Sequence, residues 1–220
     1  QNHGRSKMQE HLLRYKKGVK YCYLDFETFN LCLSFVHNRY WQNGMIKVVE
    51  DHIVDEADIR VKWDSHLKIG EGALRVVDYN KEENDKLAVN QKEAFDKMEE
   101  WLDWADYIVG HNLFSFDFPL IQEHCRMNKK DWKKWAPKII DTKCLVYGSK
   151  TDYLFNPDED DLFTYQLRIF EEFKRGVKTN LTLCAKERGI EHDYDSLHDA
   201  LCDLKLNIKL FDKLKWELEI

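Results

Sequence analysis

Length and composition place the chain among single-domain globular proteins. Its 220 residues are enough for one ordinary domain, or one domain with an elaborated insertion, and exclude a multidomain machine. Hydrophobic residues make up 43% and aromatic residues 13%, which suffices for a closed core. With 9 Gly and 3 Pro, collagen-like and low-complexity chains are excluded, and no apolar run approaches the roughly 18 residues of a membrane span.

The charge balance argues against several classes of partner. A net charge of −6, from 34 basic and 40 acidic residues, repels nucleic acid, acidic membranes and nucleotides alike. Residues 1–20 are basic, so the rest of the chain is more acidic than the total indicates. Composition alone therefore predicts neither a membrane nor a nucleic-acid partner.

Six cysteines are scattered along the chain without a CxxC pair, and no apolar signal segment precedes them. Reduced thiols in an intracellular, cytoplasmic protein are therefore expected, in the host cytoplasm if the protein is viral. A disulfide framework or a zinc site is the alternative. Because the chain begins without Met, the residues before Met8 are expected to be in part a cloning remnant.

The first half of the chain predicts the order β-β-β-α-β. Residues 21–26 are aromatic-rich and nearly continuous in apolar content, as in a central strand covered on both faces. Asn90 is a candidate N-cap for the helix of this half. The remaining predicted elements are strands at 44–49 and 52–54, the helix up to residue 105, and a buried strand at 107–110.

The second half predicts mainly helices. The predicted elements are a helix over 119–125, a strand over 138–142, a helix over 181–188 closed by Gly189, and a helix over 198–216 with Ser196 as candidate N-cap. We expect a lead-in at residues 1–19 and a single domain over 20–220, with an insertion near 144–178. Its acidic part, 152–172, is predicted to be a loop and helix without an assigned role.

Asp25 and Glu27 lie two residues apart on the first predicted strand, so both carboxylates project from the same face. Most Asp-x-Glu pairs face solvent. This pair lies in an apolar run, however, where an unpaired carboxylate costs several kcal/mol. Two adjacent buried carboxylates favour a divalent cation.

A second polar cluster follows the strand at 107–110. Taken alone, His111 and Asn112 are more readily explained as structural residues that hydrogen-bond the turn. Asp117 is different, because its neighbours Phe116, Phe118 and Pro119 should remove it from water. It too needs a positive partner.

The third cluster lies at the start of the last helix. His198 and Asp203 are five residues apart, about 140° of net rotation, so they cannot share a face if both lie in ideal helix. They converge only if His198 lies at the helix entrance in a looser backbone. Each residue alone is unremarkable at its position.

Together the three clusters resemble the exonuclease motifs of the DEDDh (DnaQ-like) 3′-to-5′ exonucleases. The matching patterns are Asp25-x-Glu27, His111-Asn112-x3-Phe116-Asp117 and His198-x4-Asp203. The resemblance extends over about residues 20–211, with weaker support from Gly110 and from Ile140-Asp141-Thr142, and residues 30–42 look like phage-encoded members. It implies an α/β ribonuclease-H-like fold: a mixed central sheet of about five strands, one of them antiparallel, flanked by helices.

The resemblance also implies a mechanism. Asp25, Glu27, Asp117 and Asp203 would hold two Mg²⁺ or Mn²⁺ ions, a choice that suits oxygen-only ligands. His198 would be the general base, since an ordinary histidine titrates near neutral pH. The residues expected to hold the terminal nucleotide or line the site are Thr28, Phe29, Leu31 or Leu33, His111 and Asn112.

The implied substrate is a single-stranded 3′ end, with DNA favoured over RNA, and the implied partners are a polymerase or another replication protein, in proofreading or DNA repair. An exoribonuclease is one alternative, and an inactive nucleic-acid-binding or scaffold protein on the same fold is another. Lysines at 129, 130, 133 and 134, interleaved with Trp132 and Trp135, are the candidate track for the phosphate backbone; a solvated helix face explains them equally well. Lys16, Lys17 and Lys20 are a second candidate track.

Overall fold

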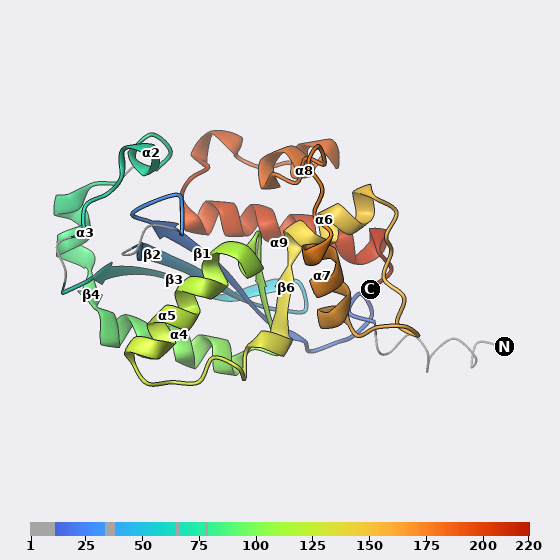
Figure 1. Ribbon diagram of the computed structural model, residues 1–220, viewed down its shortest axis with the longest axis horizontal. Helices are drawn as coiled ribbons and strands as arrows, with labels where there is room; N and C mark the ends of the chain where they lie inside the picture. The colour runs from blue at the N-terminus through green and yellow to red at the C-terminus, as the bar shows by residue number, and fades with distance from the viewer. Residues whose placement is uncertain (1–11, 34–37, 65–66, 78) are drawn as a thin grey trace.

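A computed structural model describes residues 12–33, 38–64, 67–77 and 79–220 of the chain. Most of the expected lead-in, residues 1–11, and part of the segment that looks like phage-encoded members, residues 34–37, lie outside the described residues. The described part is a mixed six-stranded sheet between two groups of helices (Figure 1).

The sheet has the strand order β4-β3-β2-β1-β5-β6. Its strands are β1 Lys20–Thr28, β2 Tyr40–Val49, β3 His52–Lys62, β4 Val89–Asn90, β5 Tyr107–Gly110 and β6 Ile139–Asp141. Only β2 runs against its neighbours, since β1 and β3 both pair with it antiparallel and the other pairs are parallel. The predicted mixed α/β sheet with one antiparallel strand is therefore confirmed. The additional strand is the two-residue β4.

Eight α-helices lie among the described residues, in addition to short π-helical and 3-10 turns. They are α2 Glu71–Leu74, α3 Lys81–Leu87, α4 Gln91–Trp104, α5 Phe118–Met127, α6 Thr142–Lys150, α7 Leu162–Glu171, α8 Leu181–Glu187 and α9 Ala200–Glu217. Asn90 caps α4 as predicted, because its side chain accepts a hydrogen bond from the Glu93 N–H. Ser196 does not cap α9. Its hydroxyl donates to Asp193, and Asp199 is the N-cap.

The central strand β1 is buried on both faces and separates two cores. Tyr21 and Tyr23 pack into the core formed with α6, α8 and α9, whereas Cys22 and Leu24 pack into the core formed with α4 and α5 (Figure 1). This alternation with period two is what a strand covered on both faces requires. The next residues on the α9 face are Asp25 and Glu27.

The segment between β6 and α8 is packed against the edge of the sheet. Gln166 of α7 is fully buried; its Oε1 accepts from the Asp141 N–H at 2.7 Å, and its Nε2 donates to the Ile139 carbonyl at 3.0 Å. One side-chain amide thus satisfies the outer edge of β6, where a further strand would otherwise pair.

Within the described ranges, no helix is both long enough and apolar enough to cross a membrane.

The contact between α6 and α7 depends on Gly148. A Cβ atom at Gly148 would collide with the Tyr165 hydroxyl and lie 2.9 Å from the Tyr153 carbonyl oxygen. We therefore expect Gly148→Ala to lower the free energy of unfolding in urea by about 1–3 kcal/mol, the usual cost of overpacking. Gly72→Ala is the matched control, because its Cβ would meet only the Leu31 Cδ1 at 3.6 Å. Equal stability of the two variants would contradict this packing.

Candidate active site

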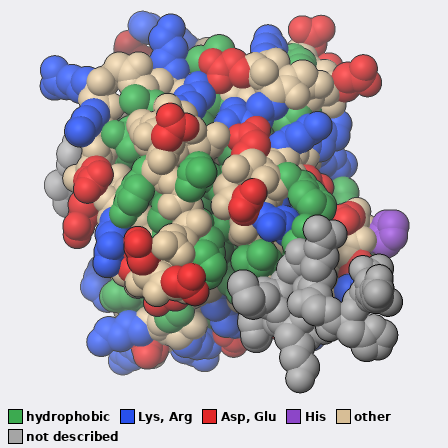
Figure 2. Space-filling view, turned by 90° about the vertical axis from the view of Figure 1, so that its right-hand side faces the viewer, with side chains coloured by type: hydrophobic (Ala, Val, Ile, Leu, Met, Phe, Trp, Pro, Cys, Tyr) green, Lys and Arg blue, Asp and Glu red, His purple; other side chains and the backbone are tan. Residues whose placement is uncertain are grey.

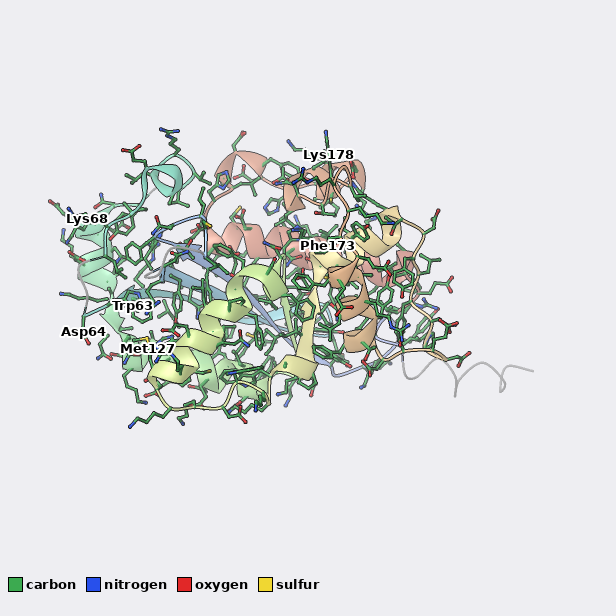
Figure 3. All side chains as sticks on the ribbon, in the orientation of Figure 1. Trp63, Asp64, Lys68, Met127, Phe173 and Lys178 are labelled. Atoms are coloured by element: carbon green, nitrogen blue, oxygen red, sulfur yellow. The ribbon has the colours of Figure 1, made fainter. Side chains whose placement is uncertain are left out.

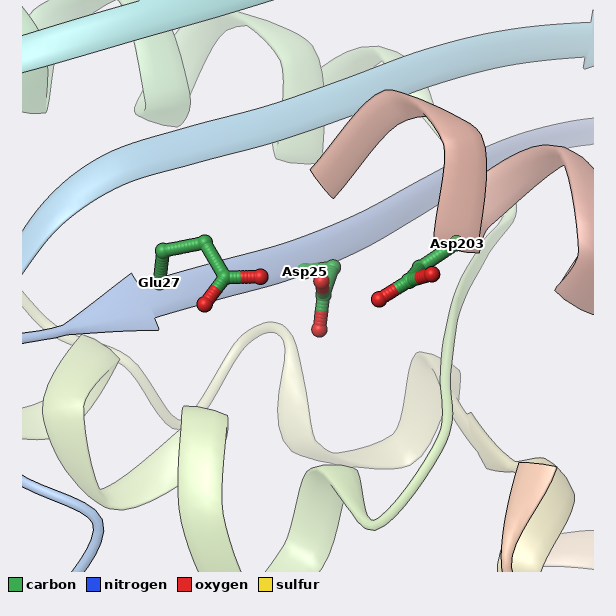
Figure 4. Close-up of side chains that lie close together, drawn as sticks. All are labelled: Asp25, Glu27 and Asp203. Atoms are coloured by element: carbon green, nitrogen blue, oxygen red, sulfur yellow. The ribbon is translucent and has the colours of Figure 1, made fainter. Parts of the chain in front are cut away.

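Three carboxylates from two elements face one another at the end of β1 (Figure 4). One oxygen each of Asp25, Glu27 and Asp203 lies within 4.8 Å of the other two. Asp25 and Glu27 share the α9 face of β1, and Asp203 projects from the first turn of α9. The structure thus brings together carboxylates that are far apart in sequence.

Because Gly44 has no side chain, α9 lies close enough to the sheet for Asp203 to reach Asp25 and Glu27. It is the register partner of Asp25 on β2. A Cβ atom at Gly44 would lie 2.7 Å from the Ala200 Cβ and 3.2 Å from the Ala200 carbonyl carbon. The first residue of α9 therefore rests directly on the backbone of β2, and a side chain at position 44 would hold Asp203 away from Asp25.

Asp117 supplies a fourth carboxylate from beneath β1. It ends a π-helical turn, Leu113–Asp117, that leads directly into α5, and such turns frequently mark functional sites. The side chain is 3% exposed, and its Oδ1 accepts from the Phe26 N–H at 3.0 Å. Among charged groups, Asp117 has the largest effect on the pKa of Asp25. It therefore faces the cluster, although it is not one of the three mutually closest carboxylates.

Burial raises the pKa values of all four carboxyl groups, and repulsion from neighbouring acids adds to each rise. The pKa of Asp25 lies well above its usual value, those of Glu27 and Asp117 rise to about 8, and that of Asp203 rises to about 6, in each case chiefly by burial. Arg60 and His198 only partly oppose the rise at Glu27 and Asp203. A cluster of oxygen donors that favours added positive charge fits a hard divalent cation such as Mg²⁺ or Mn²⁺.

His198 lies just outside α9, as its pairing with Asp203 requires. It has a left-handed backbone, φ 73°, and follows the 3-10 turn Tyr194–Ser196. Its backbone N–H donates to the Asp203 Oδ1 at 3.3 Å, and the residue is exposed. This is the looser helix entrance predicted from the five-residue spacing. The imidazole is left accessible beside the carboxylates.

His111 is placed differently. Its Nδ1 lies 2.9 Å from the Thr142 hydroxyl, and its Nε2 lies 2.7 Å from the Thr179 carbonyl oxygen. Burial lowers the pKa of His111 to about 4, so the ring is neutral at physiological pH. His111 therefore lines the pocket and links β5 to the segment before α8.

Asn112 and the turn after it are held by Asp141, whose role the sequence did not reveal. The Asp141 carboxylate is 1% exposed and accepts hydrogen bonds from the N–H groups of Asn112, Phe114 and Lys143, each within 3.0 Å. Asn112 has φ 68°, a left-handed conformation that asparagine tolerates. The sequence signal for this role was an Asp-Thr pair at the end of a predicted strand. In the structure Asp141 ends β6 and is the N-cap of α6.

The residues predicted to hold a terminal nucleotide have different environments. The Thr28 side chain is buried, and its hydroxyl donates to the Asn30 carbonyl at 2.6 Å. Phe29 is 6% exposed and packs in a small cluster with Trp41 and Val77. Leu31 is 55% exposed. Only Leu31 among the three therefore offers its side chain to a ligand.

The predicted lysine track lies in the loop after Met127, which Figure 3 labels at the end of α5. Lys130 pairs with Glu99, and Lys134 pairs with both Glu99 and Asp103. Trp135 is fully buried. Acidic residues of α4 thus neutralise this part of the track, which argues against it as a phosphate-binding surface.

The face turned toward the viewer in Figure 2 is mixed in charge, with basic and acidic side chains interspersed. Lys16 and Lys17, from the second candidate track, line a pocket that also contains Glu50 and Asp51. Opposite charges at these positions weaken the case for extended phosphate binding there.

A family model described as RNase_T, exonuclease, matches residues 22–211. No curated protein matches the chain by sequence. Among solved structures, E. coli Exonuclease I in complex with a 5cy-dT13 oligonucleotide is 16% identical, with a TM-score of 0.66 over 92% of this chain and 41% of that one. The same enzyme with a dA16 oligonucleotide gives 17% identity and a TM-score of 0.69 over 91% and 42%. An ExoI/SSB-Ct complex gives 17% and 0.67 over 92% and 42%. The chain thus spans about two fifths of the length of these structures.

The raised carboxyl pKa values predict that the metal-free protein loses stability as pH rises. Because these groups bind protons more tightly in the folded state, the free energy of unfolding in chelator should fall between about pH 4 and pH 8. Asp25→Asn should flatten this slope and raise the melting temperature at pH 8 by a few °C. The same replacement at the exposed Asp158 is the control. A stability of the wild type that rises over this pH range would contradict the proposed electrostatics.

Gly44→Ala should separate Asp203 from Asp25 because the added methyl group meets Ala200. We expect Mn²⁺ affinity, measured by calorimetry, to fall by about tenfold or more, the usual effect of disturbing the support of a metal site. Ala200→Gly in the same protein should restore part of the affinity, since it removes the closer contact. If Gly44→Ala alone bound Mn²⁺ with wild-type affinity, the position of Asp203 on α9 would not depend on this close approach.

Proposed function

Because the chain belongs to the RNase_T exonuclease family, we propose that it removes nucleoside monophosphates from the 3′ ends of single-stranded DNA. The family match confirms the resemblance to DEDDh exonucleases that the three motifs indicated, and the mixed sheet is the ribonuclease-H-like fold of that class. The chain is accordingly a nuclease of the DEDDh class. Its polarity, its preferred nucleic acid and its mechanism are the subjects of the proposal.

The observation that carries the proposal is the cluster of Asp25, Glu27 and Asp203, with Asp117 beside it. We propose that Asp25, Glu27 and Asp203 hold two Mg²⁺ or Mn²⁺ ions and that Asp117 completes the site. When bound, two such ions stabilise the attacking and leaving oxygens of a phosphodiester. The raised pKa values of the four carboxyls support this assignment, because a bound dication would offset the negative charge that burial makes unfavourable.

His198 is the proposed general base. Its backbone N–H is held by the Asp203 carboxylate, and the residue is exposed at the edge of the cluster. An imidazole there can accept the proton of the attacking water without being buried itself. His111 is proposed to line the site and support the turn that carries Asp117, because both of its ring nitrogens already have partners.

A single-stranded DNA end is the proposed substrate, because the similar structures of E. coli Exonuclease I are complexes with dT13 and dA16 oligonucleotides. Leu31 is proposed to contact the terminal bases, since stacking on apolar side chains tolerates any sequence. Thr28 and Phe29 are proposed to contribute through their backbone. A polymerase or another replication protein is the proposed partner, which co-purification of the two proteins would test.

The test of function is digestion of single-stranded DNA labelled at either end. We expect nucleoside monophosphates to be released from the 3′ end in Mg²⁺ or Mn²⁺, with no reaction in chelator. Asp25→Ala and His198→Ala should each lower kcat by at least about 100-fold, the usual contribution of a general base or metal ligand. Asp158→Ala, an exposed carboxylate, is the control.

Each other outcome of this experiment has a defined meaning. Faster digestion of a matched RNA oligonucleotide would make the protein an exoribonuclease. Binding without digestion would indicate an inactive protein on the same fold. Unchanged activity in both variants, or rescue by Zn²⁺ but not by Mg²⁺ or Mn²⁺, would overturn the assigned site.

A further inference from the structure

A basic loop leads from α7 to the carboxylate pocket. Residues 173–180, with the sequence FKRGVKTN, contain three cations and no acid, although the chain as a whole carries a net charge of −6. The loop ends at α8, whose first residue, Leu181, lines a pocket of about 120 Å³ together with Asp25 and Asp203. Figure 3 labels Phe173 beside α6 and α7, and Lys178 near the start of α8. The three cations therefore lie on a segment that runs up to the proposed metal site.

Contacts with α6 hold the start of this loop. The Tyr147 hydroxyl donates a hydrogen bond to the Glu172 carbonyl at 3.1 Å and accepts one from the Lys174 N–H at 3.3 Å. The Phe173 ring packs edge-on against the Tyr147 ring, with 5.1 Å between their centroids. The main chain on both sides of Phe173 is thus fixed to the body of the domain.

The end of the loop is held by α6 and by the active site. The Lys150 Nζ donates to the Lys178 carbonyl at 2.7 Å. The next carbonyl along the chain, that of Thr179, lies 2.7 Å from His111 Nε2 in the carboxylate pocket. The path of the loop main chain is therefore set on both sides of its basic stretch.

The three cationic side chains are free of carboxylates, in contrast to the fixed main chain. Lys174, Arg175 and Lys178 are exposed, and none of them forms an ion pair with any residue in the ranges that the structure describes. Lys150 on α6, in comparison, pairs with Glu187 at 2.6 Å. The loop therefore presents three positive charges to solvent that no acid of the described chain neutralises.

Lys143 extends this line of cations to the turn after β5. It is half-buried, and its Nζ donates to the Asn112 Oδ1 at 3.1 Å. The same Nζ lies 5.2 Å from the centroid of the Phe173 ring. Asn112 begins the π-helical turn that carries Asp117. One further cation thus lies between that turn and the first residue of the loop.

We propose that loop 173–180 and Lys143 bind the phosphate backbone of the single strand whose 3′ end occupies the metal site. The inference rests on the proposed function and deepens it, because it names the surface that holds the nucleotides before the terminal one. Lysine and arginine bind phosphate oxygens without reading the sequence, as removal of any nucleotide requires. Because the chain as a whole is acidic, unpaired cations beside the site determine the path of the strand.

Digestion of a long and a short substrate in Mg²⁺ tests this inference. Lys174→Gln, Arg175→Gln and Lys178→Gln are combined in one loop variant, and a dT13 oligonucleotide is compared with the thymidine dinucleotide. The dinucleotide has a single phosphodiester, which the metal site occupies, so no phosphate remains for the loop. We expect the KM for dT13 to rise about 10- to 100-fold at about 0.1 M salt, with kcat and the dinucleotide KM unchanged.

The salt dependence of KM is a second readout. Each phosphate contact with a single strand contributes about 0.7 to the slope of log KM against log salt concentration. The loop variant should therefore lose up to about 2 of the wild-type slope for dT13. A variant that keeps the charges, with Lys174→Arg, Arg175→Lys and Lys178→Arg, should retain the wild-type KM and slope.

The lysine track after Met127 provides the matched control. Lys130→Gln, Lys133→Gln and Lys134→Gln together change the net charge by the same amount, in a segment where Glu99 already pairs with two of the lysines. The KM of this control for dT13 should be that of the wild type. Circular dichroism and the melting temperature show that each variant is folded.

The outcomes separate this inference from the proposed function. A wild-type KM for dT13 in the folded loop variant would overturn the role of the loop and leave the exonuclease proposal intact. Equal rises of KM in the loop variant and the control would overturn it too, because net charge rather than the loop would then determine affinity. A wild-type protein that digests neither dT13 nor the dinucleotide would overturn the proposed function and, with it, this inference.

Discussion

Electrostatic repulsion among carboxylates held away from water is the constraint on which the rest of the site depends. Each such group costs several kcal/mol when it is buried without a partner. The surrounding structure must therefore hold Asp25, Glu27, Asp117 and Asp203 together against this cost. The alternation of β1, the missing side chain at Gly44 and the π-helical turn before α5 each supply one part of the geometry. Packing of both cores stabilises the arrangement.

Asp141 provides an internal comparison, because its carboxylate is buried and yet structural. Three backbone N–H groups donate to its carboxylate, so its hydrogen-bonding capacity is largely satisfied within the protein. No such set of donors faces Asp25 within the part of the chain that the structure describes, and its neighbours are further acids. The two aspartates thus differ in whether the protein supplies hydrogen-bond donors to the carboxylate. With its donors, Asp141 supports the backbone, whereas Asp25, which lacks them, favours a bound cation.

Features with a local signal were predictable from the sequence. The apolar run of β1, the Asn90 cap and the spacing of His198 and Asp203 are properties of neighbouring residues, and the structure agrees with each. Helix α3 was missed because its sequence, KEENDKL, has no apolar periodicity. The end of β6 was extended too far, since Thr142 already begins α6.

Features that depend on tertiary contacts were not predictable in this way. The lysines after Met127 formed a basic pattern in sequence, but α4 places acids against them. The role of Gly44 depends on where α9 crosses β2. Asn207 gave one weak signal, a polar residue in an apolar helix. Its side-chain oxygen accepts a hydrogen bond from the Thr142 hydroxyl, a contact between α9 and α6 that its own helix does not reveal.

The position of Asp203 on the last helix has a consequence during synthesis of the protein. The ribosome makes β1 early and α9 after every other described element, so a growing chain carries Asp25 and Glu27 long before their partner exists. An incomplete chain therefore lacks both Asp203 and the proposed base. On the proposed assignment, the metal site and its base can assemble only after α9 has been made and has packed against β1 and β2.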